Sequence, residues 1–298
     1  MTYHNPDRHW RALLLTLAVY CLTAGPLTAA NLPALVDTDW LSQRLTDKQL
    51  VIIDMSDSLQ YQRFHIPGAR HLPYNAINQQ SRQGVSYSVG PQAIAKLMGQ
   101  LGVTPQHTVV IYDDTGGLNA ARLYWELQRL HHARVTLLDG GLVKWIREGR
   151  SVSWTPQHIQ PMSYELKQVN TALLSQKHDI GNTSTLLDVR TQEEYQGHPR
   201  VPRSGHIPGA RHFPWDSAVN FDSDFTMKSD AELKRMLASL GMTDPNQEVT
   251  LYCRSGHRAS HTFFTLKRLG WNHVRLYDGS STEYELDKAA PLKKGPVP

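Results

Sequence analysis

A single cysteine stands where a predicted strand runs into a loop rich in cationic side chains. The stretch VTLYCRSGHRAS (residues 249–260) begins with an apolar run and continues with Cys253, two arginines, a histidine and a glycine. The chain has two cysteines, and the other, Cys21, lies in a segment that we expect to be removed. Cys253 then has no partner for an internal disulfide, so either an inert buried thiol or a reactive one is expected.

The residues that follow Cys253 favour the reactive thiol. A compact loop containing Gly256 can turn successive backbone N–H groups inward, and the helix that follows adds the positive end of its dipole. These groups, together with Arg254 and Arg258, should lower the pKa of the Cys253 thiol and give a thiolate at neutral pH. The same groups would hold an anionic substrate beside the nucleophile, which places and stabilises the reacting atoms.

The chain contains two copies of one unit. The sequence HIPGARH occurs at residues 65–71 and again, identically, at residues 206–212. Other similar segments follow in the same order in both copies: VIIDMS (51–56) with TLLDVR (185–190), VVIYDD (109–114) with VTLYCR (249–254), and TLLDGG (136–141) with RLYDGS (275–280). Asp113 therefore aligns with Cys253, which predicts that only the second copy is catalytic.

Short apolar runs alternate with helix-like segments in each copy. Residues 229–241 predict a helix with a Ser-x-x-Glu capping box at Ser229 and Glu232, and residues 259–269 predict another. Alternation of strand and helix predicts an α/β fold with a parallel sheet covered by helices on both faces, in two tandem domains. Ligands bind such sheets beyond the carboxyl ends of the strands, where Cys253 is placed. The predicted boundaries are a signal peptide at 1–30, a first domain at 31–155, a linker at 156–172 and a second domain at 173–298.

The N-terminal segment is typical of a secretory signal. Residues 8–11 supply positive charge, and residues 12–22 form an apolar stretch. A segment rich in small residues follows, and signal cleavage is expected after Ala30. Eleven residues are too few to span a bilayer, which needs about 20. We therefore expect a periplasmic or secreted protein with no membrane attachment after signal removal.

Composition limits the classes of function. The 298 residues are 40 % hydrophobic and 19 % charged, which is typical of a globular protein. The net charge is +4 and the pI is about 9.0, but basic and acidic residues are interspersed. With no basic run or aromatic stripe, nucleic-acid binding is not expected.

Taken together, these motifs resemble the two-domain rhodaneses, a family of thiosulfate and related sulfurtransferases. The resemblance extends from about Asn31 to Pro291 and rests on the paired HIPGA motifs, LLDVR followed by EEY, the loop CRSGHR and the strand end YDGS. It implies two rhodanese-like domains, the first non-catalytic, and an enzyme that carries sulfane sulfur on cysteine as a persulfide. It implies no metal and no organic cofactor.

The resemblance also implies how the site residues act. Cys253 would attack thiosulfate, release sulfite and pass the sulfur to a thiophilic acceptor such as cyanide or a thiol. Arg254 and Arg258 would bind the sulfonate, and Ser255, Gly256 and His257 would contribute backbone N–H groups. His257 either titrates near neutral pH or only shapes the loop. The expected partners are a small anionic sulfur donor and the acceptor; no particular protein acceptor is predicted.

Two positions depart from the pattern of thiosulfate-specific members. Certain thiosulfate-specific members have an arginine immediately before the tyrosine that corresponds to Tyr195, where this chain has Glu194. They also have a basic residue two places after the cysteine, where this chain has Ser255. The second copy also has an insertion at residues 196–205. Arg203 within it is a candidate substitute for substrate binding, against the alternative of a solvated loop arginine.

Other functions remain as alternatives. Tyrosine phosphatases use Cys-x5-Arg after a histidine, whereas four residues separate Cys253 from Arg258 here and Tyr252 precedes the cysteine. Mercaptopyruvate sulfurtransferases usually have a small or neutral residue where this chain has Arg254. A non-catalytic persulfide carrier that docks a partner across the two domains is compatible with the duplication.

Residues shared by both copies are expected to serve the fold. His65 and His206 occupy matching positions, as do Asp139 and Asp278. Because one copy lacks the cysteine, we predict a structural role for these four side chains.

Overall fold

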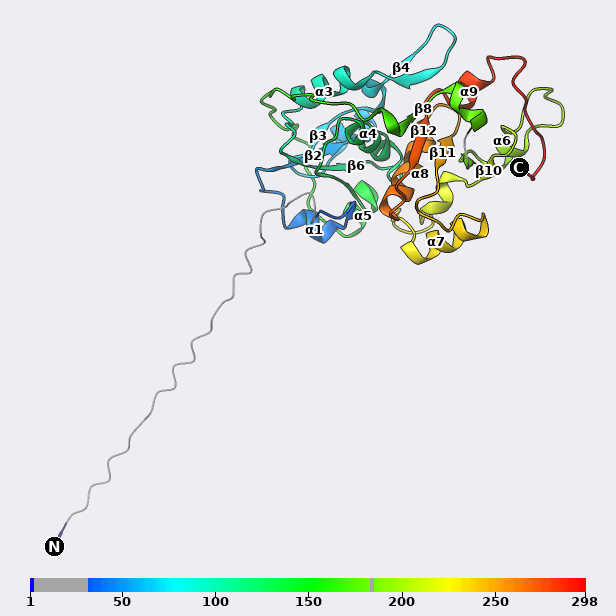
Figure 1. Cartoon of the computed structure of the whole chain (residues 1–298). Coiled ribbons are helices and arrows are strands. Elements are labelled where there is room, and N and C mark those ends of the chain that lie inside the picture. The colour runs from blue at the N-terminus through cyan, green and yellow to red at the C-terminus, as the bar shows by residue number, and fades with distance from the viewer. Residues whose placement is uncertain (3–31, 183–184) are drawn as a thin grey trace.

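Two parallel five-stranded sheets, each with helices on both faces, make up the protein (Figure 1), as the sequence predicts. The structure is a computed structural model that describes residues 1–2, 32–182 and 185–298. The predicted signal peptide lies, apart from its first two residues, outside the described residues.

The first sheet has the strand order β1-β7-β6-β2-β3, and all of its strand pairs are parallel. Its strands are β1 (Leu35–Val36), β2 (Leu50–Asp54), β3 (Arg70–His71), β6 (Thr108–Tyr112) and β7 (Val135–Leu138). Around it are α1 (Thr38–Ser42), α2 (Ser58–Arg63), η2 (Tyr74–Ile77), α3 (Pro91–Gln100), α4 (Leu118–Arg129), α5 (Gly141–Arg147) and the antiparallel hairpin β4 (Asn78–Gln80) and β5 (Ser86–Ser88).

The second sheet has the order β10-β9-β11-β12-β8, again entirely parallel. Its strands are β8 (Leu174–Ser175), β9 (Leu186–Asp188), β10 (Arg211–His212), β11 (Val249–Tyr252) and β12 (Val274–Tyr277). The helices are η3 (Thr171–Leu173), η4 (Lys177–Asn182), α6 (Gln192–Gln196), η5 (Trp215–Ala218), α7 (Asp230–Ser239), α8 (His257–Arg268) and α9 (Ser280–Tyr284).

The apolar runs of the strands explain why both faces of each sheet are covered. Because side chains alternate along a strand, Val51 and Ile53 of β2 pack into one cluster, and Leu50 and Ile52 pack into another on the opposite face. All five residues of β2 are buried. A nearly continuous apolar run of this kind is typical of a strand in a parallel sheet whose two faces are both covered by helices.

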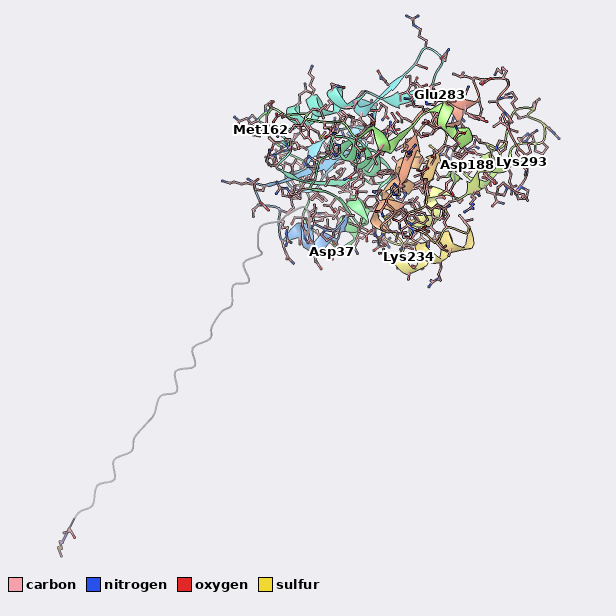
Figure 2. The ribbon with its side chains drawn as sticks, in the orientation of Figure 1. Asp37, Met162, Asp188, Lys234, Glu283 and Lys293 are labelled. Carbon is pink, nitrogen blue, oxygen red and sulfur yellow. The ribbon has the colours of Figure 1, made fainter. Side chains whose placement is uncertain are left out.

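The predicted capping box of the second domain is present. Ser229 Oγ accepts a hydrogen bond from Glu232 N, and the Glu232 carboxylate accepts one from Ser229 N. The helix α7 that follows turns Leu233 and Leu237 into the core, whereas Lys234 lies exposed (Figure 2). This is the amphipathic pattern expected of a surface helix.

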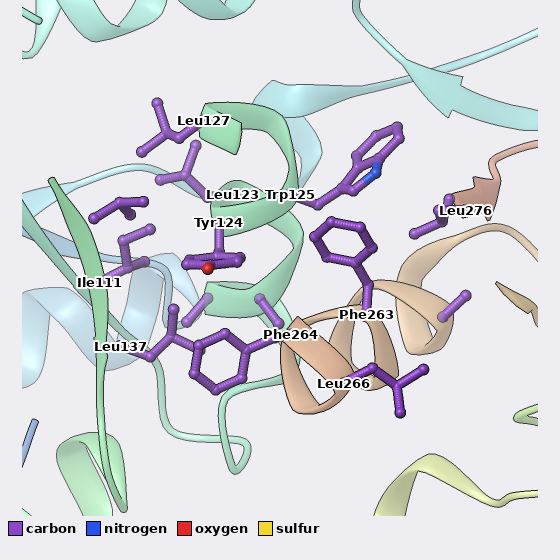
Figure 3. Close-up of a cluster of buried hydrophobic side chains, with 14 of the residues drawn as sticks. Ile111, Leu123, Tyr124, Trp125, Leu127, Leu137, Phe263, Phe264, Leu266 and Leu276 are labelled. Carbon is purple, nitrogen blue, oxygen red and sulfur yellow. The ribbon is translucent and has the colours of Figure 1, made fainter. Parts of the chain in front are cut away.

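Helices α4 and α8, one from each domain, pack against each other. Tyr124 of α4 and Phe264 of α8 make an edge-to-face contact with ring centroids 5.0 Å apart (Figure 3). Both belong to a single buried cluster that includes core residues of both sheets. Each of these helices follows the loop at the end of the central strand, β6 or β11, so this packing brings the two loops toward each other.

The predicted linker packs against the first domain. Met162 N donates to Gly99 O, and the hydroxyl of Tyr164 makes a hydrogen bond with His132 Nδ1 at 2.9 Å.

Among the described helices, none is both long and apolar enough to cross a membrane.

Candidate active site

Cys253 begins the loop between β11 and α8. Gly256 precedes the first helical residue, His257, with φ of +75°, a left-handed conformation that glycine adopts without strain. A Cβ at Gly256 would also stand 2.6 Å from Asp278 Oδ1 and 2.9 Å from Arg122 Nη1. Glycine is therefore required both by the turn and by the close approach of these two side chains.

Ser280 closes the loop from behind, a role that the sequence analysis missed. Its Oγ accepts hydrogen bonds from Cys253 N at 3.2 Å and Gly256 N at 3.0 Å, and donates to Tyr277 O. Ser280 has φ of +52°, which is strained for a residue with a side chain. The YDGS motif was a signal for this residue, but only the fold brings β12 beside the loop.

The thiol of Cys253 is buried at the base of the loop. Its Sγ accepts a hydrogen bond from Ser255 N at 3.4 Å. The backbone N–H of Ser255 therefore points at the thiol, whereas that of Gly256, which was also expected to face the substrate, is bonded to Ser280 Oγ.

The equivalent loop of the first domain holds an anion of its own. The carboxylate of Asp113 accepts hydrogen bonds from four backbone N–H groups at 2.7 to 2.9 Å, those of Thr115, Gly117, Asn119 and Ala120. The first copy has therefore kept the inward-facing N–H groups and filled them with its own side chain.

This arrangement has a chemical counterpart in the second domain. A carboxylate oxygen lies two bonds beyond Cβ, as does the outer sulfur of a cysteine persulfide. Counting from Cys253 as from Asp113, the matching N–H groups belong to Ser255, His257, Ala259 and Ser260; of these, Ser255 N donates to Cys253 Sγ and Ser260 N donates to Gly256 O. A loop of this shape can therefore surround a persulfide anion with donors.

The two loop arginines differ in environment. Arg254 is exposed, and its carbonyl accepts hydrogen bonds from Thr282 N and Oγ1. Arg258 donates two hydrogen bonds to the Glu194 carboxylate, from Nη1 at 2.5 Å and from Nη2 at 2.9 Å. Burial lowers the pKa of Arg258, but Glu194 and Cys253 raise it on balance, so the guanidinium stays charged.

Arg203 lies farther along the same side of the domain. Its guanidinium donates to the carbonyls of Lys288, Asp287 and Ala290, which ties the insertion to the C-terminal segment. Arg203 shares with Arg254 and Glu194 a cleft of about 510 Å³ between the insertion and α9. The structure thus places Arg203 in the wall of a cleft that borders the loop.

Side chains of the first domain complete the surroundings of the loop. His257 Nε2 donates to Asn119 Oδ1 at 2.8 Å, and the His257 ring stacks on Tyr74 with centroids 3.9 Å apart. Burial, together with Arg122, Arg258 and His261, lowers the pKa of His257 to about 3. The ring is neutral at pH 7, which supports the loop-shaping role for His257 over titration. Sequence reasoning missed Tyr74 and Asn119, because nothing in the chain indicates which residues the second copy touches.

A buried ion pair joins the domains directly behind the loop. Arg122 Nη1 lies 2.7 Å from Asp278 Oδ1, and Arg122 Nη2 lies 3.7 Å from Glu126 Oε1. Burial alone would lower the pKa of Arg122, but Asp278 and Glu126 raise it well above its usual value. Arg122 is therefore charged and is paired with Asp278, while Glu126 lies between Arg122 and Arg129 and is closer to Arg129, at 3.2 Å.

The paired residues of the two copies serve the fold. Asp278 accepts a hydrogen bond from Ser88 N of the first domain, and Asp139 accepts one from Met227 N of the second. His65 and His206 bond the carbonyls of Tyr61 and Tyr195 and stack on those rings. These contacts are repeated in both domains, which assigns the four side chains the predicted structural roles.

Within the described residues, no group of three or more His, Cys, Asp or Glu side chains is placed to hold a metal ion.

Comparison with known families places both halves of the chain in one class of domain. The model of the rhodanese-like domain matches residues 37–148 and again residues 170–287. The two segments together cover most of the chain.

Curated relatives match over nearly the whole of their own length. The "Sulfur carrier protein TtuD" of Thermus thermophilus is 34 % identical, with 89 % of this chain and 98 % of the relative aligned. A Mycobacterium tuberculosis protein named "Putative thiosulfate sulfurtransferase" is also 34 % identical, with 89 % of this chain and 99 % of the relative aligned.

Solved structures share the fold. YnjE superposes with a TM-score of 0.75 at 24 % identity, covering 88 % of this chain and 68 % of that one. Wild-type EanB superposes with a TM-score of 0.78 at 22 % identity, covering 89 % of this chain and 70 % of the EanB chain. At these identities the likeness is one of fold alone.

Proposed function

Because the chain belongs to the rhodanese family as a tandem of two rhodanese-like domains, we propose that it transfers sulfane sulfur from thiosulfate, through a persulfide on Cys253, to a thiophilic acceptor. It is a sulfurtransferase of that family; the donor, the acceptor and the residues that bind them are the proposal. The acceptor class comprises cyanide and thiols.

One observation carries the proposal: the loop geometry that places four backbone N–H groups around an anion two bonds beyond Cβ. In the first domain this anion is the Asp113 carboxylate. With Cys253 at the matching position, the corresponding N–H groups of Ser255, His257 and Ala259 would stabilise the outer sulfur of a persulfide.

The reaction consists of two displacements at sulfur. The Cys253 thiolate attacks the outer sulfur of thiosulfate, the S–S bond of thiosulfate breaks, and sulfite leaves with the electron pair. The acceptor nucleophile then attacks the outer sulfur of the persulfide and releases the Cys253 thiolate. Arg254 borders the cleft beside the loop, where an anionic donor would enter.

Substitution of the nucleophile tests this function. Cys253→Ser keeps the size of the side chain but removes the polarizable sulfur nucleophile, so we expect formation of thiocyanate from thiosulfate and cyanide to fall to background. Circular dichroism and thermal unfolding should match those of the unsubstituted protein. Retention of more than a few per cent of the rate would remove Cys253 from the mechanism.

A second candidate function is persulfide carriage without turnover of small molecules. It is favoured by the name of one relative, a sulfur carrier protein, and by the burial of Cys253. Both functions give a +32 Da adduct after treatment with thiosulfate, so steady-state release of thiocyanate or of a thiol persulfide distinguishes them.

We also propose that the mature protein works in the periplasm or is secreted. The support is the sequence of the N-terminal segment, with its basic start, apolar stretch and small-residue exit. Fractionation of cells, with N-terminal sequencing of the protein recovered, tests the location and the expected cleavage after Ala30.

A further inference from the structure

The ion pair between Arg258 and Glu194 changes what the site offers to a substrate. Arg258 is the second residue of α8, immediately beyond the loop, and both terminal nitrogens of its guanidinium bond the Glu194 carboxylate. The two side chains are only 20 % and 28 % exposed. A bidentate pair at this burial is screened by salt less than a pair on the open surface.

Glu194 is fixed on its own helix. In the capping box of α6, Thr191 Oγ1 accepts from Glu194 N, and the Glu194 carboxylate accepts from Thr191 N. Burial alone would raise the pKa of Glu194, but Arg258 and Thr191 lower it on balance. The carboxylate is therefore ionised and held in place at neutral pH.

The charges around the loop can be counted from these contacts. Arg122 is balanced by Asp278, Arg129 is balanced by Glu126, and Arg258 is balanced by Glu194. Arg254 is exposed beside the cleft. Of these four arginines, only Arg254 has no carboxylate partner among the contacts of the described residues; Arg203, which donates to backbone carbonyls, lines the same cleft. Glu194 therefore neutralises one positive charge, that of Arg258, which a donor with two negative charges would otherwise meet.

We propose that Glu194 is a specificity-determining residue that sets the site for sulfur donors with one negative charge, such as organic persulfides and thiosulfonates, in preference to the thiosulfate dianion. This inference rests on the proposed transfer through Cys253. With a thiosulfonate, the Cys253 thiolate attacks the outer sulfur, the S–S bond breaks, and a sulfinate leaves with the electron pair. The leaving group then carries one charge, where sulfite carries two.

Glu194→Gln is the variant that tests this role. Glutamine keeps the capping box and can still accept a hydrogen bond from Arg258, so only the charge is removed. We expect kcat/KM for thiosulfate to rise about tenfold, mainly through a lower KM, because one repulsive charge is lost at partial burial. With methanethiosulfonate, which carries one charge, the change should be at most about threefold.

Glu193→Gln is the matched control. Glu193 precedes Glu194 on the same helix and is exposed, and its carboxylate interacts with Thr191 and its own backbone. We expect this variant to keep the wild-type ratio between the two donors. The proposal would be overturned if the ratio of kcat/KM for thiosulfate to kcat/KM for methanethiosulfonate were unchanged in Glu194→Gln. It would also be overturned if Glu193→Gln changed this ratio by the same factor.

Alkylation of Cys253 separates this inference from the proposed function. Iodoacetate is charged and iodoacetamide is neutral, so the ratio of their rates reports the electrostatic potential at the thiol without sulfur transfer. Glu194→Gln should raise the ratio of iodoacetate to iodoacetamide rates several-fold, even if neither donor is turned over. Equal changes with both reagents would mean that Glu194 only supports the loop, which would also overturn the proposal.

Discussion

At the scale of single residues, Ser280 decides whether the loop can hold its shape. One hydroxyl accepts from the N–H groups of Cys253 and Gly256 and donates to Tyr277 O. The matching residue of the first domain is Gly141, which has nearly the same φ, +50°. The second domain thus tolerates a strained serine where the first has glycine, and gains from it a link between β12 and the loop.

Ser280→Ala should lower both stability and activity. Two buried N–H groups lose their acceptor, so we expect a loss of about 1–3 kcal/mol in the free energy of unfolding. The loop loses its link to β12, so thiocyanate formation should fall as well. Ser280→Gly loses the same hydroxyl but relieves the φ strain, and should be less destabilised with a similar loss of rate. Urea unfolding measures the stability of the two variants, and steady-state kinetics measures their rates of thiocyanate formation. A wild-type stability and a wild-type rate in Ser280→Ala would contradict this role of Ser280.

At the scale of elements, the beginning of α4 makes the first domain part of the site. Asn119 lies six residues after Asp113 in the chain, and its Oδ1 accepts from His257 of the second domain. Its backbone N–H is also one of the four that hold Asp113. The filled loop of the first domain therefore positions a side chain that orders the loop of the second.

Asn119→Asp should make the site sensitive to pH. A carboxylate beside His257 Nε2 favours the charged ring, so the pKa of His257 should rise from about 3. The ring would then gain its proton as the pH falls through this higher pKa. The rate of thiocyanate formation should change over the same pH range. NMR titration of the ring and a pH–rate profile measure the shift.

Asn119→Ala is the control for that variant. It removes the acceptor without adding charge, so burial should still keep the His257 ring neutral. We expect a lower rate with no new inflection. The same pH profile in both variants would show that Asn119 does not act through His257.

At the scale of the whole molecule, the interface of the two domains buries neutral histidines. His261 Nε2 bonds Gly116 O of the first domain, and its ring contacts Trp215 edge-on. Burial lowers the pKa of His261 to about 4. Since the unfolded chain has a histidine pKa near 6.5, the stability contributed by the neutral ring is fully present above that value. It is lost as the pH falls toward 4, because the unfolded state takes up the proton first.

His261→Gln should reduce the loss of stability in acid. Glutamine can donate to Gly116 O but does not titrate in this range. Between pH 7.5 and pH 5, the wild-type protein should lose about 2 kcal/mol more in the free energy of unfolding than the variant. Urea unfolding at both pH values checks this, with His178→Gln, at an exposed position, as the control. Parallel pH dependence in wild type and His261→Gln would refute it.

Much of the fold could be predicted from local patterns. Repetition of HIPGARH identified the duplication, and apolar runs such as Leu50–Asp54 indicated strands buried on both faces. The capping box at Ser229 predicted where α7 begins. These signals are short in range, because strand burial, capping and turns depend on residues close in the chain.

Contacts between elements could not be predicted in this way. The hydroxyl of Tyr87 on β5 donates to Glu283 on α9, a residue labelled in Figure 2, although the two are far apart in the sequence. Asp278 likewise bonds Ser88 and Arg122, both in the first domain. Each such contact depends on how the two sheets are packed together.

The sequence by itself determined the candidate nucleophile and its loop, because Cys253, Gly256 and the arginines lie within six residues at the end of one strand. Tertiary structure decided what surrounds them. It joined Arg258 to Glu194 and His257 to Asn119, partners 64 and 138 residues away in the chain. The physical reason is that charge and hydrogen bonding act over a few ångströms in space, whatever the separation along the chain.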